Sequence, residues 1–189
     1  LYRNACRLSC LLTIVTLFVA CDAHRDFPDT AMKPCHILCT DGNGYAVYLW
    51  NLEPLAFADS IGVRQNTSAD ILALDGFENT FVLLDARDVS SPLAGKAFAL
   101  WRYGQSAYIP SVAQMRLLYH TRDQINPIIK MCGGDTLPVE AGDCWYWTST
   151  EVNGQQSLKA WLFSTSSGTI HDTPKGQAHK SRAIITLRD

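Results

Sequence analysis

The sequence predicts a single α+β domain, built from small antiparallel sheets, two to three short helices and long loops. Three observations predict this class. Asp-Gly and Asn-Gly turns at residues 41–44 separate two short β-rich runs, 35–40 and 45–50, and indicate a hairpin. Helix-start signals occupy the middle of the chain, and aromatic and β-branched runs follow Cys144. We expect residues 51–79 to be mostly loop.

The helices are predicted from their first residues. The Ser-Pro pair at 91–92 fits an N-cap followed by proline at the first helical position, and apolar residues then recur on one face as far as Trp101. Ser111, with Gln114 three residues later, forms a capping box that begins a second helix. We expect a third, short helix to begin at the Asn-Pro pair 126–127 and to end before the Gly-Gly pair that follows.

The remainder of the chain has a β pattern. Strands are predicted over residues 145–150, 158–164 and 182–187. A turn at residues 166–168 follows the second of them. Trp147 and Trp161 lie in these strands, and we expect both to be core residues because aromatic side chains dominate the apolar surface that a core buries.

The first 21 residues differ from the rest. Arg3 and Arg7 precede the apolar run 8–20, which is too short to cross a bilayer comfortably and is typical of a secretory signal peptide. The run ends Phe-Val-Ala-Cys, which is similar to the lipobox of bacterial lipoproteins and predicts that Cys21 is lipidated. An ordinary signal peptide or a buried N-terminal helix is the alternative. The predicted organisation is therefore a signal peptide over 1–21, a tether over 22–34 and one domain over 35–189.

The composition excludes two classes of protein. Hydrophobic residues are 47% and charged residues 18%, which excludes a disordered chain. The 16 Lys+Arg and 18 Asp+Glu leave no basic excess, so we expect no nucleic-acid partner.

No P-loop, GxGxxG or GxSxG pattern is present in the sequence. His171 and His179 lack an identifiable third metal ligand. We therefore predict no cofactor, no metal and no catalytic residue.

Four cysteines follow the predicted lipidation site. Cys132 and Cys144 flank a Gly/Pro-containing loop, and a disulfide between them would contribute about 3 kcal/mol in the chain-entropy model. Cys35 and Cys39 lie about 13 Å apart on an extended strand, too far for a disulfide. The alternative is that all four are buried thiols.

Several segments together resemble a known family. They are the Ile-Pro-Ser run 109–111 at a helix start, the Trp-Thr-Ser-Thr-Glu block 147–151, the Ala-Trp pair 160–161 and the basic and aliphatic last strand, 179–187. Together they resemble the DUF1566-type domains of bacterial exported proteins, which have a C-type-lectin-like fold. With its signal, the chain is similar to surface lipoproteins of Bacteroides-type bacteria. It departs from the family at Tyr108, where that pattern has Arg-Leu before the proline, and in its last strand, which lacks the Val-Arg pair.

The resemblance implies that the last strands and their loops form an exposed binding face. A surface rich in Ser, Gln and His can hydrogen-bond a partner without burying charge, although ordinary loop composition would look the same. The candidate ligand-binding residues are Trp145, Tyr146, Glu151, Gln155, Gln156, Lys159, Ser166, His171, Thr173, Lys175 and His179. The Glu-Pro-Asn and Trp-Asn-Asp motifs of calcium-dependent lectins are absent from the sequence.

These observations lead to one functional prediction and three alternatives. We predict a non-catalytic, exported binding or structural protein, anchored to the outer membrane or cell surface through lipid and bound to an unknown protein or glycan. The alternatives are a fimbria-associated assembly component, a retroelement-diversified surface receptor, and an oxidase or hydrolase that would use His171 or Cys144.

Overall fold

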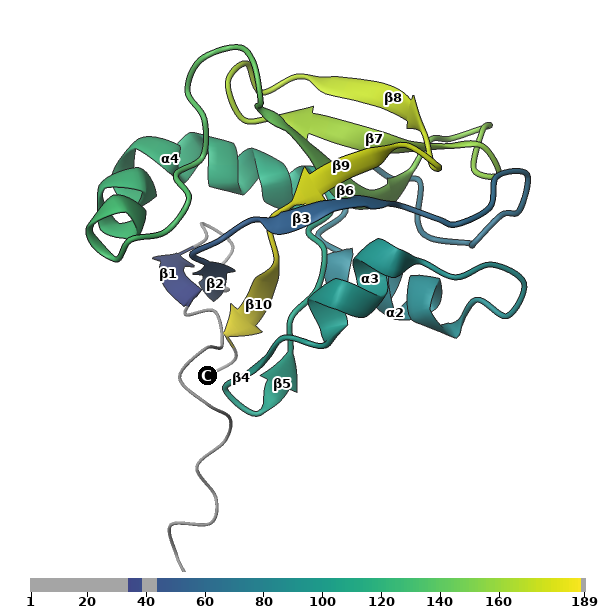
Figure 1. The fold of residues 1–189 in the computed structure, drawn as a ribbon, viewed down its shortest axis with the longest axis horizontal. Helices are drawn as coiled ribbons and strands as arrows, with labels where there is room; N and C mark the ends of the chain where they lie inside the picture. Colours follow the sequence, from purple (N-terminus) through teal and green to yellow (C-terminus); the bar gives the residue numbers. More distant parts are fainter. Residues whose placement is uncertain (1–33, 39–43, 188–189) are drawn as a thin grey trace, which may run out of the picture. The chain divides into compact units, whose positions relative to one another are not determined.

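The computed structural model describes residues 34–38 and 44–187, which belong to one compact unit. The predicted signal peptide, Cys21 and nearly all of the predicted tether lie outside the described residues. The α+β prediction is confirmed, because the described residues form three helices and ten strands in four small antiparallel sheets. Figure 1 shows how these elements are arranged.

The first sheet joins the two ends of the described chain. β1 (Pro34–Leu38) pairs with β2 (Gly44–Tyr48), which confirms the predicted N-terminal hairpin. β10 (Ile184–Leu187) pairs with the other edge of β2. β2 is therefore the central strand of the order β1-β2-β10, and its residues 45–48 are all buried.

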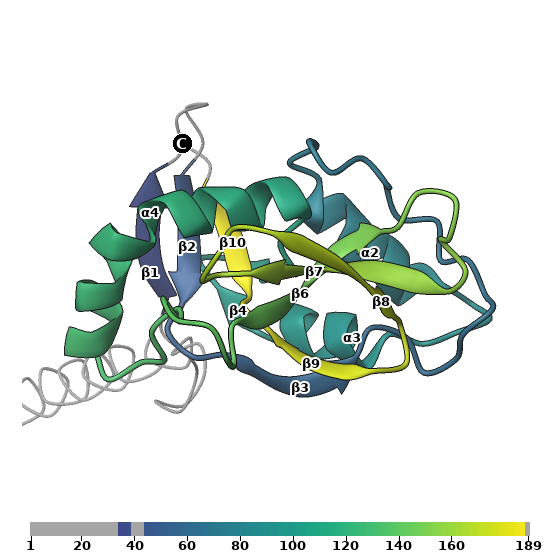
Figure 2. The ribbon, with the colours of Figure 1, turned by 90° about the horizontal axis from the view of Figure 1, so that it is seen from above.

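The second large sheet has the order β6-β7-β8, formed by β6 (Trp145–Glu151), β7 (Lys159–Ser164) and β8 (Ile170–Pro174). The first two strands and the turn between the second and third were predicted, but β8 was not. A separate pair, β3 (Leu52–Ala56) with β9 (Ala178–Ser181), lies beside β6 (Figure 2). β3 lies in the region that was predicted to be loop.

Two of the helices lie on one side of these strands. α2 (Gly76–Asp85) packs against β6, and α3 (Pro92–Phe98) packs against β3 and α2. α2 was not predicted, because its N-cap, Asp75, makes no capping bond with its side chain among the described residues. At Gly76 a Cβ would lie 2.7 Å from the Ile109 carbonyl oxygen and 2.8 Å from the Ser111 nitrogen, so α2 begins where only glycine fits.

The start of α3 was predicted correctly, but its end was not. Ser91 caps the helix by accepting a hydrogen bond from the backbone nitrogen of Ala94 at 3.2 Å. The helix stops at Phe98, and Trp101 lies instead in the hairpin of β4 (Trp101–Arg102) and β5 (Gln105–Ser106). The turn of this hairpin places Tyr103 and Gly104 at positive φ, 52° and 73°, which a continuing helix does not allow.

α4 (Val112–Met131) is a single helix that covers both the second and the third predicted helices. Its N-terminus has the predicted capping box, with Ser111 N donating to Gln114 Oε1 at 2.9 Å. The predicted third helix does not exist separately, because α4 continues through Pro127. Ile125 and Ile129 are buried on either side of that proline, and their packing outweighs the local loss of a backbone hydrogen bond.

The core has two parts, one on each face of the strands. Along β2, Ala46 and Tyr48 belong to the part that contacts α2 and α3, whereas Tyr45 and Val47 belong to the part that contacts α4. β6 divides in the same way at Tyr146 and Trp147, because successive side chains of a strand point to opposite faces. The strands thus form a middle layer that is covered by helices on both sides.

The two tryptophans predicted as core residues differ. Trp147 is fully buried, packs edge-on against Phe57 at a ring distance of 5.5 Å and donates from Nε1 to the Leu55 carbonyl oxygen at 3.1 Å. Trp161 is only half-buried and packs at the margin of the α4 side of the core. The prediction is confirmed for Trp147 and only in part for Trp161.

Candidate functional site

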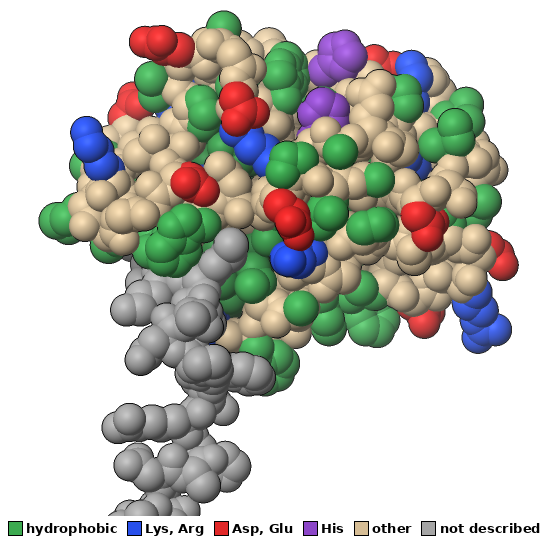
Figure 3. Space-filling model, viewed as in Figure 1, with side chains coloured by type: hydrophobic (Ala, Val, Ile, Leu, Met, Phe, Trp, Pro, Cys, Tyr) green, Lys and Arg blue, Asp and Glu red, His purple; other side chains and the backbone are tan. Residues whose placement is uncertain are grey.

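A cleft of about 540 Å³ lies between β3, β9 and the residues just before β6. We name it the Trp145 cleft. Trp145 is half-buried at the first position of β6, and the side chains of Glu53, Asp143 and His179 line the same space. Figure 3 shows histidine side chains close together on this side of the molecule, among apolar and acidic ones. The cleft therefore combines an aromatic surface with carboxylates and an imidazole.

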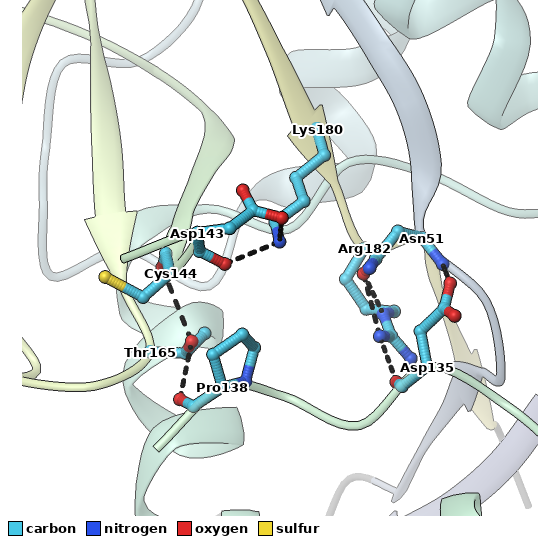
Figure 4. A network of polar contacts seen from close by, with 8 residues as sticks. All are labelled: Asn51, Asp135, Pro138, Asp143, Cys144, Thr165, Lys180 and Arg182. Atoms are coloured by element: carbon cyan, nitrogen blue, oxygen red, sulfur yellow. Dashed lines mark hydrogen bonds and ion pairs between the residues drawn. The ribbon is translucent and has the colours of Figure 1, made fainter. Parts of the chain in front are cut away.

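The pairing of β9 with β3 positions two residues of the cleft, His179 and Lys180. His179 pairs in register with Leu55, and its ring lies edge-on to Trp147 at a ring distance of 5.4 Å. The following residue, Lys180, is almost completely buried. Its Nζ donates to the backbone and carboxylate oxygens of Asp143, both at 2.6 Å, as Figure 4 shows. Lys180 thus neutralises one cleft carboxylate and positions the residues that lead into β6.

The protonation state of His179 follows from its surroundings. Burial lowers the pKa of the His179 imidazole, which the negative charge of Asp143 opposes and the neighbouring His171 reinforces. His179 is therefore uncharged at neutral pH and can both donate and accept a hydrogen bond. His171 on β8 extends the site, since its ring lies 5.9 Å from that of Trp145.

The loop between α4 and β6 is held by polar contacts rather than by the predicted disulfide. Cys132 is an exposed free thiol and Cys144 a buried one, so that prediction is wrong for this structure. Arg182 donates to the Asp135 carbonyl oxygen at 2.5 Å, and Thr165 donates to that of Pro138 at 3.0 Å (Figure 4). These bonds hold the loop at several points, so its closure needs no covalent link.

Cys144 has its own polar partners. Its sulfur lies 3.4 Å from Ser164 Oγ, and Ser166 donates to it at 3.3 Å. Burial raises the pKa of the Cys144 thiol, but the hydrogen bonds from Ser164, Ser166 and nearby backbone outweigh burial and lower the pKa overall. The predicted ligand-binding residue Ser166 is thus a partner of this thiol.

The structure brings together only part of the predicted binding set. Trp145 and His179 line the cleft, and His171 adjoins it. The predicted residues that are buried and cannot meet a ligand at the surface are Tyr146, Glu151, Thr173 and Lys175. They were assigned to the exposed face that the family resemblance implies, whereas the structure buries them.

The other predicted residues lie away from the cleft. Gln155 is exposed and Gln156 half-buried, both in the connection between β6 and β7. Lys159 pairs with Asp172 across β7 and β8 at 2.5 Å, and this contact lowers the pKa of the Asp172 carboxyl. None of the three lines the Trp145 cleft.

Sequence reasoning missed Glu53, Asp143 and Lys180. Glu53 was assigned to a loop, and Asp143 was regarded only as part of the cysteine-flanked loop. The alternation of β9, with a half-buried His179 before a buried Lys180, is the only local signal, and it depends on knowing the strand.

A larger groove of about 770 Å³ lies between the last turns of α4 and the following loop. It is lined by residues such as Asn126, Pro127, Leu137 and Val139, and none of its described lining residues is aromatic or histidine. We therefore regard the smaller Trp145 cleft as the better candidate, because ligand sites combine apolar or aromatic surface with a few convergent polar groups.

A scan against models of protein families found no match, and a search of curated proteins found no significant one. Within residues 34–38 and 44–187, no group of three or more His, Cys, Asp or Glu side chains is arranged to hold a metal ion. None of the helices in the described part of the chain has the length and apolar character required to cross a membrane.

Proposed function

We propose that the protein is an exported, lipid-anchored, non-catalytic binding protein, and that the Trp145 cleft recognises a glycan. The observation that carries the proposal is the half-buried Trp145 ring beside Glu53, Asp143 and His179. One face of a sugar ring is apolar and can stack on an indole, and its hydroxyls can pair with carboxylate oxygens and an imidazole. A cleft of about 540 Å³ is within the usual size range of small-ligand sites.

The charges of the cleft support a neutral, hydroxyl-rich ligand over an anionic one. Lys180 already pairs with Asp143, so it offers no free positive charge, and His179 is uncharged at neutral pH. Glu53 is exposed, and Lys96 pairs with it at 2.9 Å from the α3 side. The carboxylate oxygens and the uncharged imidazole of the cleft remain able to accept hydrogen bonds from the hydroxyl groups of a ligand.

The binding test is a glycan array followed by calorimetry with the strongest hit. Trp145→Ala is expected to weaken binding by about 5- to 150-fold, because an aromatic stacking contact contributes about 1–3 kcal/mol. Trp101→Ala is the matched control, because Trp101 is 43% exposed on the β4–β5 hairpin and does not line the cleft. Equal loss in both variants, or no loss in Trp145→Ala, would contradict the assignment.

The anchor is tested separately. The Phe-Val-Ala-Cys run that ends at Cys21 is the basis for proposing lipidation and a position at the outer membrane or cell surface. Cells fed a palmitate analogue are expected to label the wild-type protein and not Cys21→Ala. Equal labelling of the two would remove the anchor from the proposal and leave the binding cleft untouched.

A further inference from the structure

Three polar side chains meet in the interior, away from the Trp145 cleft. Lys175 and Glu151 are fully buried and Gln65 is 2% exposed. Lys175 Nζ forms an ion pair with Glu151 Oε1 and donates to Gln65 Oε1 at 3.2 Å. The backbone nitrogen of Gln65 also donates to Glu151 Oε1 at 3.2 Å, and the Phe57 ring lies 5.3 Å from the ammonium. The three groups therefore form one tight, water-excluded cluster.

As a purely structural ion pair this cluster is incomplete. Glu151 Oε2 and Gln65 Nε2 are both buried, and neither has a hydrogen-bond partner among the described residues. Buried polar atoms without partners cost stability, and a buried ion pair gives little net stability by itself. The cluster holds an amine, a carboxyl group and a carboxamide, which are the reactants and the proton carrier of an amide exchange.

We propose that Lys175 and Gln65 form an intramolecular isopeptide bond, with Glu151 as the proton-transfer group. The Lys175 nitrogen attacks the side-chain carbonyl carbon of Gln65, a new N–C bond forms, and the bond from that carbon to Nε2 breaks. Ammonia leaves, so one amide replaces another and no oxidant or reductant is required.

The protons balance through Glu151. Its carboxylate takes a proton from the Lys175 ammonium, which frees the nitrogen lone pair for attack. The protonated carboxyl then gives a proton to the leaving nitrogen and takes the second proton from the attacking one. The product is a secondary amide that keeps one N–H, and the remaining proton departs with ammonia as ammonium or stays on Glu151.

The surroundings favour this exchange. Burial lowers the pKa of the Lys175 ammonium, against the opposing effect of the Glu151 carboxylate. The amine is already within hydrogen-bond distance of the carboxamide that it would attack, so no encounter step is needed. Water is excluded from all three groups, which protects the new bond from hydrolysis.

The bond would connect distant parts of the chain. Gln65 lies between β3 and α2, Lys175 follows β8, and the two are 110 positions apart in the sequence. A cross-link over so long a loop would restrict the unfolded chain strongly. It would also tie the long segment before α2 to the β8–β9 turn.

The experiment compares the intact masses of the denatured wild-type protein and of Lys175→Arg, both purified as the full processed chain. We expect the wild-type protein to be lighter than the mass calculated from its sequence by the mass of one ammonia. Lys175→Arg should have the full mass calculated from its own sequence. Tryptic digestion of the wild type should yield a branched peptide that joins residues 65–87 to residues 160–180, with Lys175 uncleaved because its nitrogen is acylated. Fragmentation should place the link between the Gln65 and Lys175 side chains.

Two further variants define the roles. Glu151→Gln is expected to retain the full mass of its sequence while circular dichroism confirms that it is folded. Lys159→Arg is the matched control, because Lys159 pairs with Asp172 at the half-exposed β7–β8 surface and should leave the branched peptide intact. Folded wild-type protein without the branched peptide would overturn the proposal. A link through Glu151 with loss of water would overturn the assignment of Gln65 as acyl donor.

Discussion

Replacing Arg182 by methionine tests how the loop before the Trp145 cleft is held. The guanidinium is fully buried and donates to the carbonyl oxygens of Tyr48, Leu49 and Asp135 at 2.8, 2.9 and 2.5 Å. It also donates twice to Asn51 Oδ1, at 3.1 and 2.7 Å. Methionine keeps most of the aliphatic stem and removes every one of these donors.

The expected loss can be worked out acceptor by acceptor. The Leu49 carbonyl keeps the backbone nitrogen of Asp135 at 2.8 Å, and Asp135 is exposed, so its own carbonyl can bind water. The buried Tyr48 carbonyl loses its guanidinium partner, which costs about 1–3 kcal/mol. With about 1 kcal/mol for each of the two other acceptors, Asn51 Oδ1 and the Asp135 carbonyl oxygen, the free energy of unfolding should fall by about 3–5 kcal/mol.

The assay is urea unfolding followed by far-ultraviolet circular dichroism. A loss of this size corresponds to a decrease in Tm of roughly 10 °C for a domain of this length. Arg87→Met is the matched control, because Arg87 is exposed, and it should change the unfolding free energy by less than about 0.5 kcal/mol. A loss of less than about 1 kcal/mol in Arg182→Met would refute the reasoning that these bonds hold the loop.

Three further predictions concern packing, titration and thiols. Gly76→Ala should lower the unfolding free energy by about 2 kcal/mol or more, because the new Cβ would overlap backbone atoms at 2.7–2.8 Å. Gly95→Ala is the control: Gly95 has open space around it in α3, so this change should raise the unfolding free energy by about 0.5–1 kcal/mol. Urea unfolding of both variants distinguishes the two outcomes. The pKa of His179 is lower in the folded protein than in the unfolded protein, where it is near 6.5. The unfolding free energy should therefore decrease as the pH falls below about 6.5, and His179→Gln should make this decrease smaller. Unfolding free energies measured between pH 5 and 7.5 check the direction of the change. Iodoacetamide should alkylate Cys132 in the folded protein and Cys144 only after unfolding, whereas protection of both until reduction would restore the disulfide.

Local signals predicted those elements whose ends are stabilised by neighbouring residues. The capping box at Ser111 and the N-cap at Ser91 have the expected hydrogen bonds, and β1 pairs with β2 as the predicted hairpin requires. α2 has no such cap, and its position depends on the fit of Gly76 against the backbone before α4. Contacts between distant segments left no local pattern, so neither α2 nor β3 could be predicted.

The residues of the candidate site were also only partly predictable from the sequence. Trp145 and His179 were predicted, but Glu53 and Asp143 meet them only because β3 pairs with β9 and Lys180 holds the start of β6. Lys175 was predicted to lie on the exposed face that the family resemblance implies, but its side chain is fully buried. It is buried because the β8–β9 turn packs onto the end of β6 and the segment before α2.

The sequence by itself determined the α+β class, the cap positions, the first hairpin and the strands around the Trp-Thr-Ser-Thr-Glu block, because each of these follows from side-chain periodicity and bonds between near neighbours. Only the tertiary structure decided that α4 continues through Pro127, that polar contacts rather than a disulfide hold the loop after α4, and that Glu151, Lys175 and Gln65 meet in the interior. These outcomes depend on burial and on hydrogen bonds between segments far apart in the chain. Such contacts can stabilise the fold only after the sheets and helices have packed together.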